Sequence, residues 1–181
     1  MRRILVAFTS ADRQTGKVAH HIARELEDAG LLVRLVDIRS GETEAGSDDC
    51  DGVIVAGSLR EGRFDPELYA FVQRHGDTLR RCSTSAFVPV SMGAASPIEG
   101  ERSAADECVR NFTADVGWAP DDICPTGGAL YERDLSPLER ASLHSLLDRR
   151  DVSLNAPADA ECTDWVALDR FIHAFAARVL P

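Results

Sequence analysis

The sequence RILVAFTSADRQT, residues 3–15, joins an apolar run to a polar one and indicates the fold class. Residues 3–8 are rich in β-formers, which is typical of a buried strand. The polar stretch 9–15 follows, and apolar residues then recur at helical spacing over residues 18–29. Gly30 stands where a helix-terminating glycine is expected. The chain therefore opens with a predicted strand, a polar loop and a predicted helix.

The same alternation continues along the chain. Asp65 with Pro66 is typical of a helix start, and Asp164 is expected to cap the last helix. Pro125 suits an edge strand, whereas Pro89 lies within a predicted strand without an evident reason. Alternating strands and helices predict an α/β fold whose parallel sheet is covered by helices on both faces. Further strands are predicted at residues 31–38, 52–57, 85–91 and 123–130, and further helices at residues 65–79, 101–116 and 164–179.

Residues 131–162 do not fit the alternation. Within them, residues 136–139 form a capping box with Pro137 in its first turn, which predicts a helix over residues 135–150. Residues 151–162 have the composition of an open loop. Because 181 residues suffice for one domain with a substantial core, we expect a single domain, 1–181, that carries 131–162 as an insertion.

Composition and charge exclude several classes of function. The net charge of −10 argues against nucleic acid as a partner, because phosphate backbones need a basic surface. The five cysteines form no CxxC pair and the histidines no HExxH motif, so we expect no metal site. No apolar run has the length of a membrane span, and the basic start reads as a strand and not as a signal peptide. Scattered cysteines fit reduced thiols in a cytoplasmic protein.

The candidate site lies in the loops after three strands, because open parallel sheets bind ligands at their carboxyl ends. In loop 9–15, hydroxyls and a helix start suit a phosphate monoester, although the same residues could simply cap the helix. Loop 58–64 could bind a ligand through its backbone amides and a positive φ at Gly62, or it could be a plain connection from strand to helix. Loop 91–97 has small residues that suit a flat ring or an ordinary turn. No nucleophile–base pair stands out, so no catalytic residue is assigned.

Taken together, five segments resemble one family in order and spacing. They read FTSADRQT at 8–15, VIVAGSLREGRF at 53–64, SAFVPVSM at 85–92, GGAL at 127–130 and TDW at 163–165. The chain resembles the flavodoxin-like, menaquinone-dependent protoporphyrinogen IX dehydrogenases over nearly its whole length. The resemblance implies a flavodoxin-like three-layer sandwich with a five-stranded parallel sheet, strand order 2-1-3-4-5, and FMN as the cofactor that carries out two-electron transfer.

The resemblance also implies which residues bind FMN. By position, the 5′-phosphate is held by Thr9, Ser10, Gln14 and Thr15. One side of the isoalloxazine is lined by Ser58, Leu59, Arg60 and Gly62, and the other by Ser91, Met92, Gly93 and Ala94. Arg13 stands where the family commonly has glycine. If its backbone is left-handed, we expect a guanidinium–phosphate contact to offset the strain.

Three functions follow as alternatives. The first is an FMN-dependent oxidoreductase that oxidises protoporphyrinogen or a related substrate and passes electrons to a quinone or other acceptor. Such an enzyme would form a homodimer or act alone, with at most peripheral contact at the inner face of a membrane. The insertion at 135–150 is less basic and less aromatic than that of the family, which weakens the quinone and porphyrinogen assignments more than the flavin. The others are an electron-transfer flavodoxin that docks a basic reductase, and a flavin-free module that Arg13 would favour.

Overall fold

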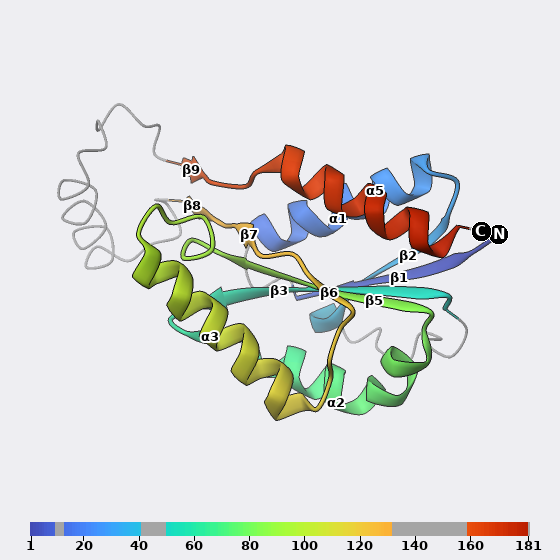
Figure 1. Ribbon diagram of the computed structural model, residues 1–181, viewed down its shortest axis with the longest axis horizontal. Helices are drawn as coiled ribbons and strands as arrows, with labels where there is room; N and C mark the ends of the chain where they lie inside the picture. The colour runs from blue at the N-terminus through green and yellow to red at the C-terminus, as the bar shows by residue number, and fades with distance from the viewer. Residues whose placement is uncertain (10–12, 41–49, 132–158, 181) are drawn as a thin grey trace.

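A parallel sheet forms the middle of three layers (Figure 1). The computed structural model describes residues 1–9, 13–40, 50–131 and 159–180. Helices α1 (Arg13–Asp28) and α5 (Trp165–Val179) cover one face, and α2 (Pro66–Arg81) and α3 (Glu99–Val116) cover the other. The strands of the sheet are β1 (Arg3–Phe8), β2 (Leu32–Asp37), β3 (Gly52–Arg60), β5 (Thr84–Ser91), β6 (Asp122–Ile123) and β7 (Thr126–Gly127), with the short β4 (Arg63–Phe64) beside β3.

The strand order confirms the predicted topology. The order is β2-β1-β3-β5-β6, in which β5 is the fourth main strand and β6 and β7 share the fifth position. Phe8 pairs with Ala56, and Ser58 pairs with Val90, all in parallel register. The carboxyl ends of β1, β3 and β5 therefore meet at one edge of the sheet, which lies at the left in Figure 1.

The core is split by the sheet because side chains alternate between its faces along each strand. Ile4, Val6 and Phe8 of β1 pack on the side of α1 and α5, whereas Leu5 and Ala7 pack on the side of α2 and α3. Fully burying one such aliphatic side chain stabilises the fold by about 1.5–3 kcal/mol. Both faces of the central strands are buried, which explains the apolar runs in the middle of these strands.

The fifth strand differs from the prediction, because residues 123–130 do not form one continuous strand. It is broken between β6 and β7, and the common register of both pieces places Pro125 level with Pro89 of β5. The carbonyl of Phe87 accepts from Cys124 N–H at 2.9 Å, so the backbone groups of every second residue of β5, counted from Phe87, point toward the fifth strand. Pro89 also faces it and has no N–H to donate. Its position in a buried strand is thereby explained, because the ladder toward β3 does not need that N–H.

Loop 58–64 also differs from the prediction, because most of it is a β-hairpin. Strand β3 continues to Arg60, and β4 pairs back antiparallel, with Leu59 opposite Phe64. The two turn residues, Glu61 and Gly62, have φ values of 50° and 75°, as a type I′ hairpin turn requires. The predicted positive φ at Gly62 is confirmed. Phe64 is buried, with its ring 5.3 Å from that of Phe87, and anchors the hairpin to the core.

Several predicted helix ends are confirmed and others shift. Asp65 caps α2 by accepting from Glu67 N–H, Asp164 caps α5, and Gly30 follows α1 with a φ of 85°. Helix α1 begins at Arg13, earlier than its apolar pattern, because polar residues fill its first turn. The first strand and the helix at 101–116 agree with the prediction to within two residues.

Two short strands frame the insertion. β8 (Ala129–Tyr131) and β9 (Asp159–Glu161) pair antiparallel, so the two ends of the insertion lie side by side. The prediction of open loop over residues 151–162 is therefore wrong at β9. The helix predicted at residues 135–150 lies outside the described residues.

Candidate functional site

Three segments converge at the carboxyl edge of the sheet, and the β8–β9 ribbon lies at the same end of the molecule (Figure 1). They are the start of the connection after β1, the β3–β4 hairpin, and the turn after β5. Twelve of the thirteen predicted site residues are described, and Ser10 lies outside the described residues. The topology thus brings together the three predicted loops at one edge.

Thr9 is the most distinctive residue of the first segment. Its side chain is fully buried, its backbone N–H donates to Ala56 C=O at 3.3 Å, and its hydroxyl has no hydrogen-bond partner among the described residues. Leaving a buried hydroxyl without a partner costs about 1–3 kcal/mol. A phosphate oxygen bound beside the end of β1 would supply the missing acceptor. The residues present therefore fit a phosphate group at this position.

The N-terminus of α1 adds positive potential to the same place. This helix has 16 residues and Arg13 and Lys17 in its first two turns, with no acidic residue in the first turn. The unpaired N–H groups of a helix start attract anions. Arg13 is exposed, and Glu61 is the one non-glycine residue with positive φ in the described part of the chain. The condition of a left-handed Arg13 is therefore not met, because Arg13 is the first helical residue of α1.

Gln14 and Thr15 are buried in the first turns of α1. The Gln14 amide donates to Thr163 Oγ1 at 2.6 Å, and Thr163 Oγ1 in turn donates to Gly127 C=O at 2.7 Å. A Cβ on Gly127 would lie 1.9 Å from Cys162 O, so only glycine permits this close approach. One amide hydrogen of Gln14 is thus directed at the segment between β9 and α5.

Glu161 makes a second connection between α1 and the end of the insertion. Its carboxylate accepts from Lys17 Nζ at 3.2 Å and from Trp165 Nε1 at 2.8 Å. Partial burial by itself raises the pKa of Glu161, but hydrogen bonds from Lys17, Trp165 and Gln14 outweigh it and lower the pKa below its usual value. We call the set Gln14, Lys17, Glu161, Thr163 and Trp165 the α1–β9 contact.

The second and third segments place their predicted site residues in different surroundings. In the hairpin, Ser58 is buried and Leu59 half-buried, while Arg60 and Gly62 are exposed. In the turn after β5, the hydroxyl of Ser91 accepts from Ala94 N–H at 3.0 Å. The hairpin and the turn therefore present backbone and small side chains at the edge where the resemblance puts the two sides of a flat ring.

The remainder of the third segment is held by the start of α3. Met92 is half-buried. A Cβ on Gly93 would lie 3.3 Å from Glu101 O, so the turn passes close to the helix. Ser96 is buried, donates to Glu101 Oε2 at 2.5 Å, and accepts from Ile98 N–H at 3.1 Å. The turn is therefore shaped by its packing against α3, whatever ligand it contacts.

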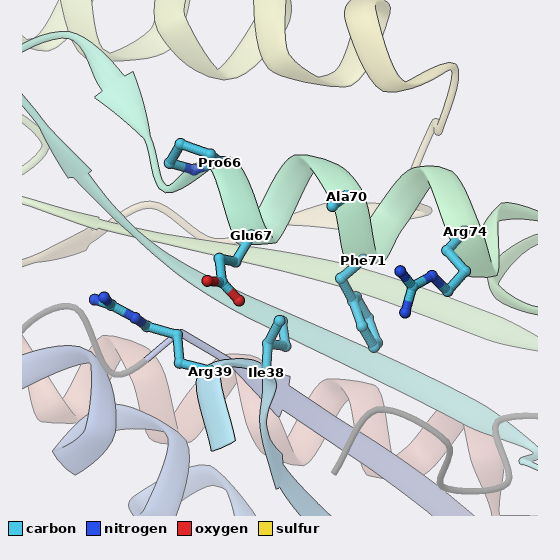
Figure 2. Close-up of a pocket in the computed structure, with 7 residues that line it drawn as sticks. All are labelled: Ile38, Arg39, Pro66, Glu67, Ala70, Phe71 and Arg74. Carbon is cyan, nitrogen blue, oxygen red and sulfur yellow. The ribbon is translucent and has the colours of Figure 1, made fainter. Parts of the chain in front are cut away.

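A surface pocket of about 310 Å³ lies on the α2 side of the sheet, between the 3₁₀ turn η1 (Ile38–Ser40) and α2 (Figure 2). Arg39 on one wall pairs with Asp65 at 3.5 Å. None of its lining residues belongs to the predicted site, so we assign it no part in FMN binding. The lining residues are Ile38, Arg39, Pro66, Glu67, Ala70, Phe71 and Arg74.

A membrane-spanning helix and a metal-binding cluster are both absent from residues 1–9, 13–40, 50–131 and 159–180, which the structure describes. In that part of the chain, no helix is both long and apolar enough to cross a membrane. The described histidines, cysteines and acidic residues include no group of three that could hold a metal ion.

Comparison with known proteins settles the family. Residues 5–149 match the model of a family described as a flavodoxin domain. The chain belongs to the flavodoxin-domain family. Over 174 residues it is 24% identical to the protoporphyrinogen IX dehydrogenase (quinone) of Escherichia coli K12, covering 96% of this chain and 94% of that protein. A Leishmania major protein of the same name is also 24% identical, over 97% of this chain and 75% of its own length.

Solved structures agree on the flavodoxin-like fold. A flavodoxin from Streptococcus pneumoniae TIGR4 matches with a TM-score of 0.55 at 17% identity, covering 97% of this chain and 99% of the other. An FMN-dependent NADH-azoreductase from Bacillus anthracis, solved with FMN, matches with a TM-score of 0.53 at 8% identity over 100% of both chains. At such identities the likeness shows the fold alone.

The α1–β9 contact is what the sequence-based prediction missed. The motif TDW stands out in the sequence by its resemblance and as a helix cap, but no pattern singles out Glu161 or Lys17. They are 144 residues apart, so no spacing rule pairs them. The one available signal is that the family motif TDW begins two residues after Glu161.

Proposed function

We propose that this flavodoxin-family chain is an FMN-dependent oxidoreductase. The 5′-phosphate is bound by the hydroxyls of Thr9 and Thr15 together with the N-terminus of α1. The isoalloxazine lies between the hairpin residues Leu59–Gly62 and the turn at 91–94. When bound, FMN supplies two-electron transfer, and the residues of the chain position it and exclude water.

The buried hydroxyl of Thr9 is the observation that carries the proposal. A threonine that only capped a helix would accept a hydrogen bond from an N–H of the first turn. Thr9 instead has an unsatisfied hydroxyl among the described residues, at the edge of a parallel sheet where phosphates bind. An anion at this point satisfies both Thr9 and the helix N-terminus.

Arg13 contributes charge in this proposal. It lies at the start of α1 without a positive φ, so its presence carries no left-handed strain. The flavin-free alternative depended on Arg13 as an obstruction to the loop, and the helical position of the residue removes that reason. A guanidinium near the phosphate adds a charge-assisted contact that is stronger than a neutral one.

The relatives support a reduced tetrapyrrole as the substrate class and a quinone as the acceptor. Both curated relatives are named protoporphyrinogen IX dehydrogenases, and the match extends through the β8–β9 ribbon that frames the insertion. Because that ribbon adjoins the carboxyl edge of the sheet, the insertion is the segment that we expect to contact the substrate. An anaerobic assay tests this assignment.

In the assay, the flavin released from purified protein is identified, and bleaching of the bound flavin by protoporphyrinogen IX is followed before a quinone is added. The proposal predicts FMN, bleaching by the porphyrinogen, and return of the flavin colour with the quinone. FMN binding without bleaching would reject the substrate and leave the flavin site standing. Absence of FMN binding would reject the proposed function itself.

An electron-transfer flavodoxin is the second candidate, and the net charge of −10 favours it. An acidic surface steers a basic protein partner at low ionic strength. The two candidates differ in substrate dependence: a flavodoxin would exchange electrons with a basic reductase and would not oxidise protoporphyrinogen.

A further inference from the structure

Two cysteines lie in contact at the opposite edge of the sheet from the three loops. The sulfur atoms of Cys50 and Cys82 are 2.8 Å apart, and the two residues are thiols that no disulfide joins. Cys50 precedes β3, and Cys82 ends α2 just before β5. Both side chains are partly exposed, so small molecules can reach them.

The sheet itself holds the two thiols together. Gly52 pairs with Thr84 in parallel register, and continuing that register by two residues places Cys50 opposite Cys82. Between them, the N–H of Ser83 donates to Asp51 C=O at 2.8 Å. Neighbouring strands lie about 4.7–4.9 Å apart, which falls within the Cα separation of about 4.4–6.8 Å that disulfides span. A bond between the sulfurs therefore needs little backbone movement.

Asp51 fixes the segment that carries Cys50. Its carboxylate accepts from Arg2 Nη1 and from Arg3 N–H, both at 2.7 Å, and thereby ties the approach to β3 onto the start of β1. The hydroxyl of Ser83 donates to Asp51 C=O at 2.5 Å. Because both flanking segments are bonded in this way, the contact between the sulfurs is a property of the fold.

We propose that Cys50 and Cys82 form an oxidation site, which a small disulfide such as oxidised glutathione converts into an intrachain disulfide bond. In the first step the Cys50 sulfur attacks one sulfur of glutathione disulfide, forms a mixed disulfide, and releases one glutathione. In the second step the Cys82 sulfur attacks Cys50 Sγ, loses its proton, and releases the second glutathione. Two protein thiols are oxidised, and two glutathione thiols are formed.

The contact between the two sulfurs shifts the pKa values of the two thiols in opposite directions. Contact with the Cys82 sulfur lowers the pKa of the Cys50 thiol, and the same contact raises the pKa of the Cys82 thiol, which lies 3.3 Å from the carbonyl oxygen of Thr78. The thiolate is the attacking form of cysteine, so Cys50 is the first nucleophile and Cys82 the resolving thiol. Cys124 differs from Cys50 in the direction of its pKa shift, because burial raises the pKa of the Cys124 thiol to about 11.

Peptide mapping of the wild-type protein gives the direct test. The folded protein is incubated with oxidised glutathione, its remaining thiols are alkylated, and it is digested with trypsin without reduction. Cleavage after arginine leaves Cys50 in the peptide 40–60 and Cys82 in the peptide 82–102, each with a single cysteine. We expect these two peptides to be joined, and the number of alkylated thiols to fall from five to three.

Variants test the roles and the specificity. Cys82→Ser should accumulate a glutathione adduct on Cys50, because the resolving thiol is absent. Cys50→Ser should leave Cys82 unmodified, and the matched control Cys124→Ala should still form the Cys50–Cys82 link. The proposal is overturned if the wild-type peptides stay unlinked, if other cysteines pair instead, or if the link forms only between molecules. The mapping needs no variant, so failure of a variant to fold leaves the test intact.

Discussion

The Gln14 amide donates a 2.6 Å hydrogen bond to Thr163 Oγ1, joining residues 149 positions apart. Gln14 lies in the first turn of the helix that follows the candidate phosphate loop, and Thr163 lies between β9 and α5. Because Thr163 also donates to Gly127 C=O, the contact ties the helix to the sheet edge where the insertion begins. The proposed phosphate site and the ends of the insertion thus share one set of hydrogen bonds.

Replacing Thr163 by valine should weaken both structure and flavin binding. Thr163→Val removes the hydroxyl that accepts from Gln14 and donates to Gly127 C=O, and we expect a loss of about 1–3 kcal/mol in the free energy of unfolding. The dissociation constant for FMN should rise by about tenfold or less, equivalent to ~1.4 kcal/mol. Urea unfolding and flavin titration measure the two effects. Thr163→Ser is the control that keeps the hydroxyl, and a valine variant as stable as the serine variant would contradict the assigned role.

Arg13→Gly should destabilise the apoprotein slightly, contrary to the expectation for a left-handed residue. Arg13 is helical, and glycine in a helix costs about 0.5–1 kcal/mol relative to alanine. Flavin titration should also show weaker FMN binding, and the loss should shrink at high salt as the charge is screened. Arg13→Lys, which keeps the charge, should lose less affinity. Tighter FMN binding in the glycine variant would show that Arg13 obstructs the site.

The two turn residues of the hairpin should differ in how much a substitution destabilises the protein. Gly62→Ala places a side chain at a φ of 75°, which costs about 1–2 kcal/mol. The added Cβ would meet Cys108 Sγ at an ordinary 3.9 Å, so the cost arises in the backbone and not from crowding. Glu61→Gly should be near neutral, because relief of strain offsets the added freedom of the unfolded chain. Thermal unfolding of both variants checks this, and equal effects would argue against the type I′ turn.

The salt bridge of Glu161 predicts a pH-dependent contribution to stability. Its hydrogen bonds lower the pKa of Glu161 from the usual 4.5, so the folded state binds this proton less tightly than the unfolded state. The contribution is therefore complete above pH 4.5 and is lost as the pH falls through the lower folded value. Glu161→Gln should be less stable than wild type at neutral pH, and the difference should narrow in acid. Glu107→Gln, at an exposed position of α3, controls for the charge alone.

Long, strongly patterned elements were predictable from the sequence. Each of these elements has a local cause that the sequence carries. Strands β1, β3 and β5 contain apolar runs because both of their faces are buried. Asp65 and Asp164 stand at helix starts because each accepts a hydrogen bond from an otherwise unpaired helix N–H. The strand order followed from the family resemblance. Local chemistry and the resemblance were therefore enough for the layers and for the edge at which the site lies.

What the sequence could not show depends on contacts between distant residues. Strand β4 has only two residues, Arg63 and Phe64, and such a segment has no period to detect. The break between β6 and β7 arises because Pro89 and Pro125 meet at one level, which only the register reveals. The contact between Cys50 and Cys82 spans 32 residues and appears only once β3 and β5 are neighbours.

Comparison of FMN with riboflavin tests the phosphate site most directly. The apoprotein is titrated with each flavin by fluorescence quenching, alongside Thr9→Val and its control Thr9→Ser, which keeps the hydroxyl. We predict that FMN binds at least about tenfold more tightly than riboflavin, a difference of ~1.4 kcal/mol. We also predict that Thr9→Val narrows this gap while Thr9→Ser preserves it. Equal affinity of the wild-type protein for FMN and riboflavin would contradict a phosphate site between β1 and α1.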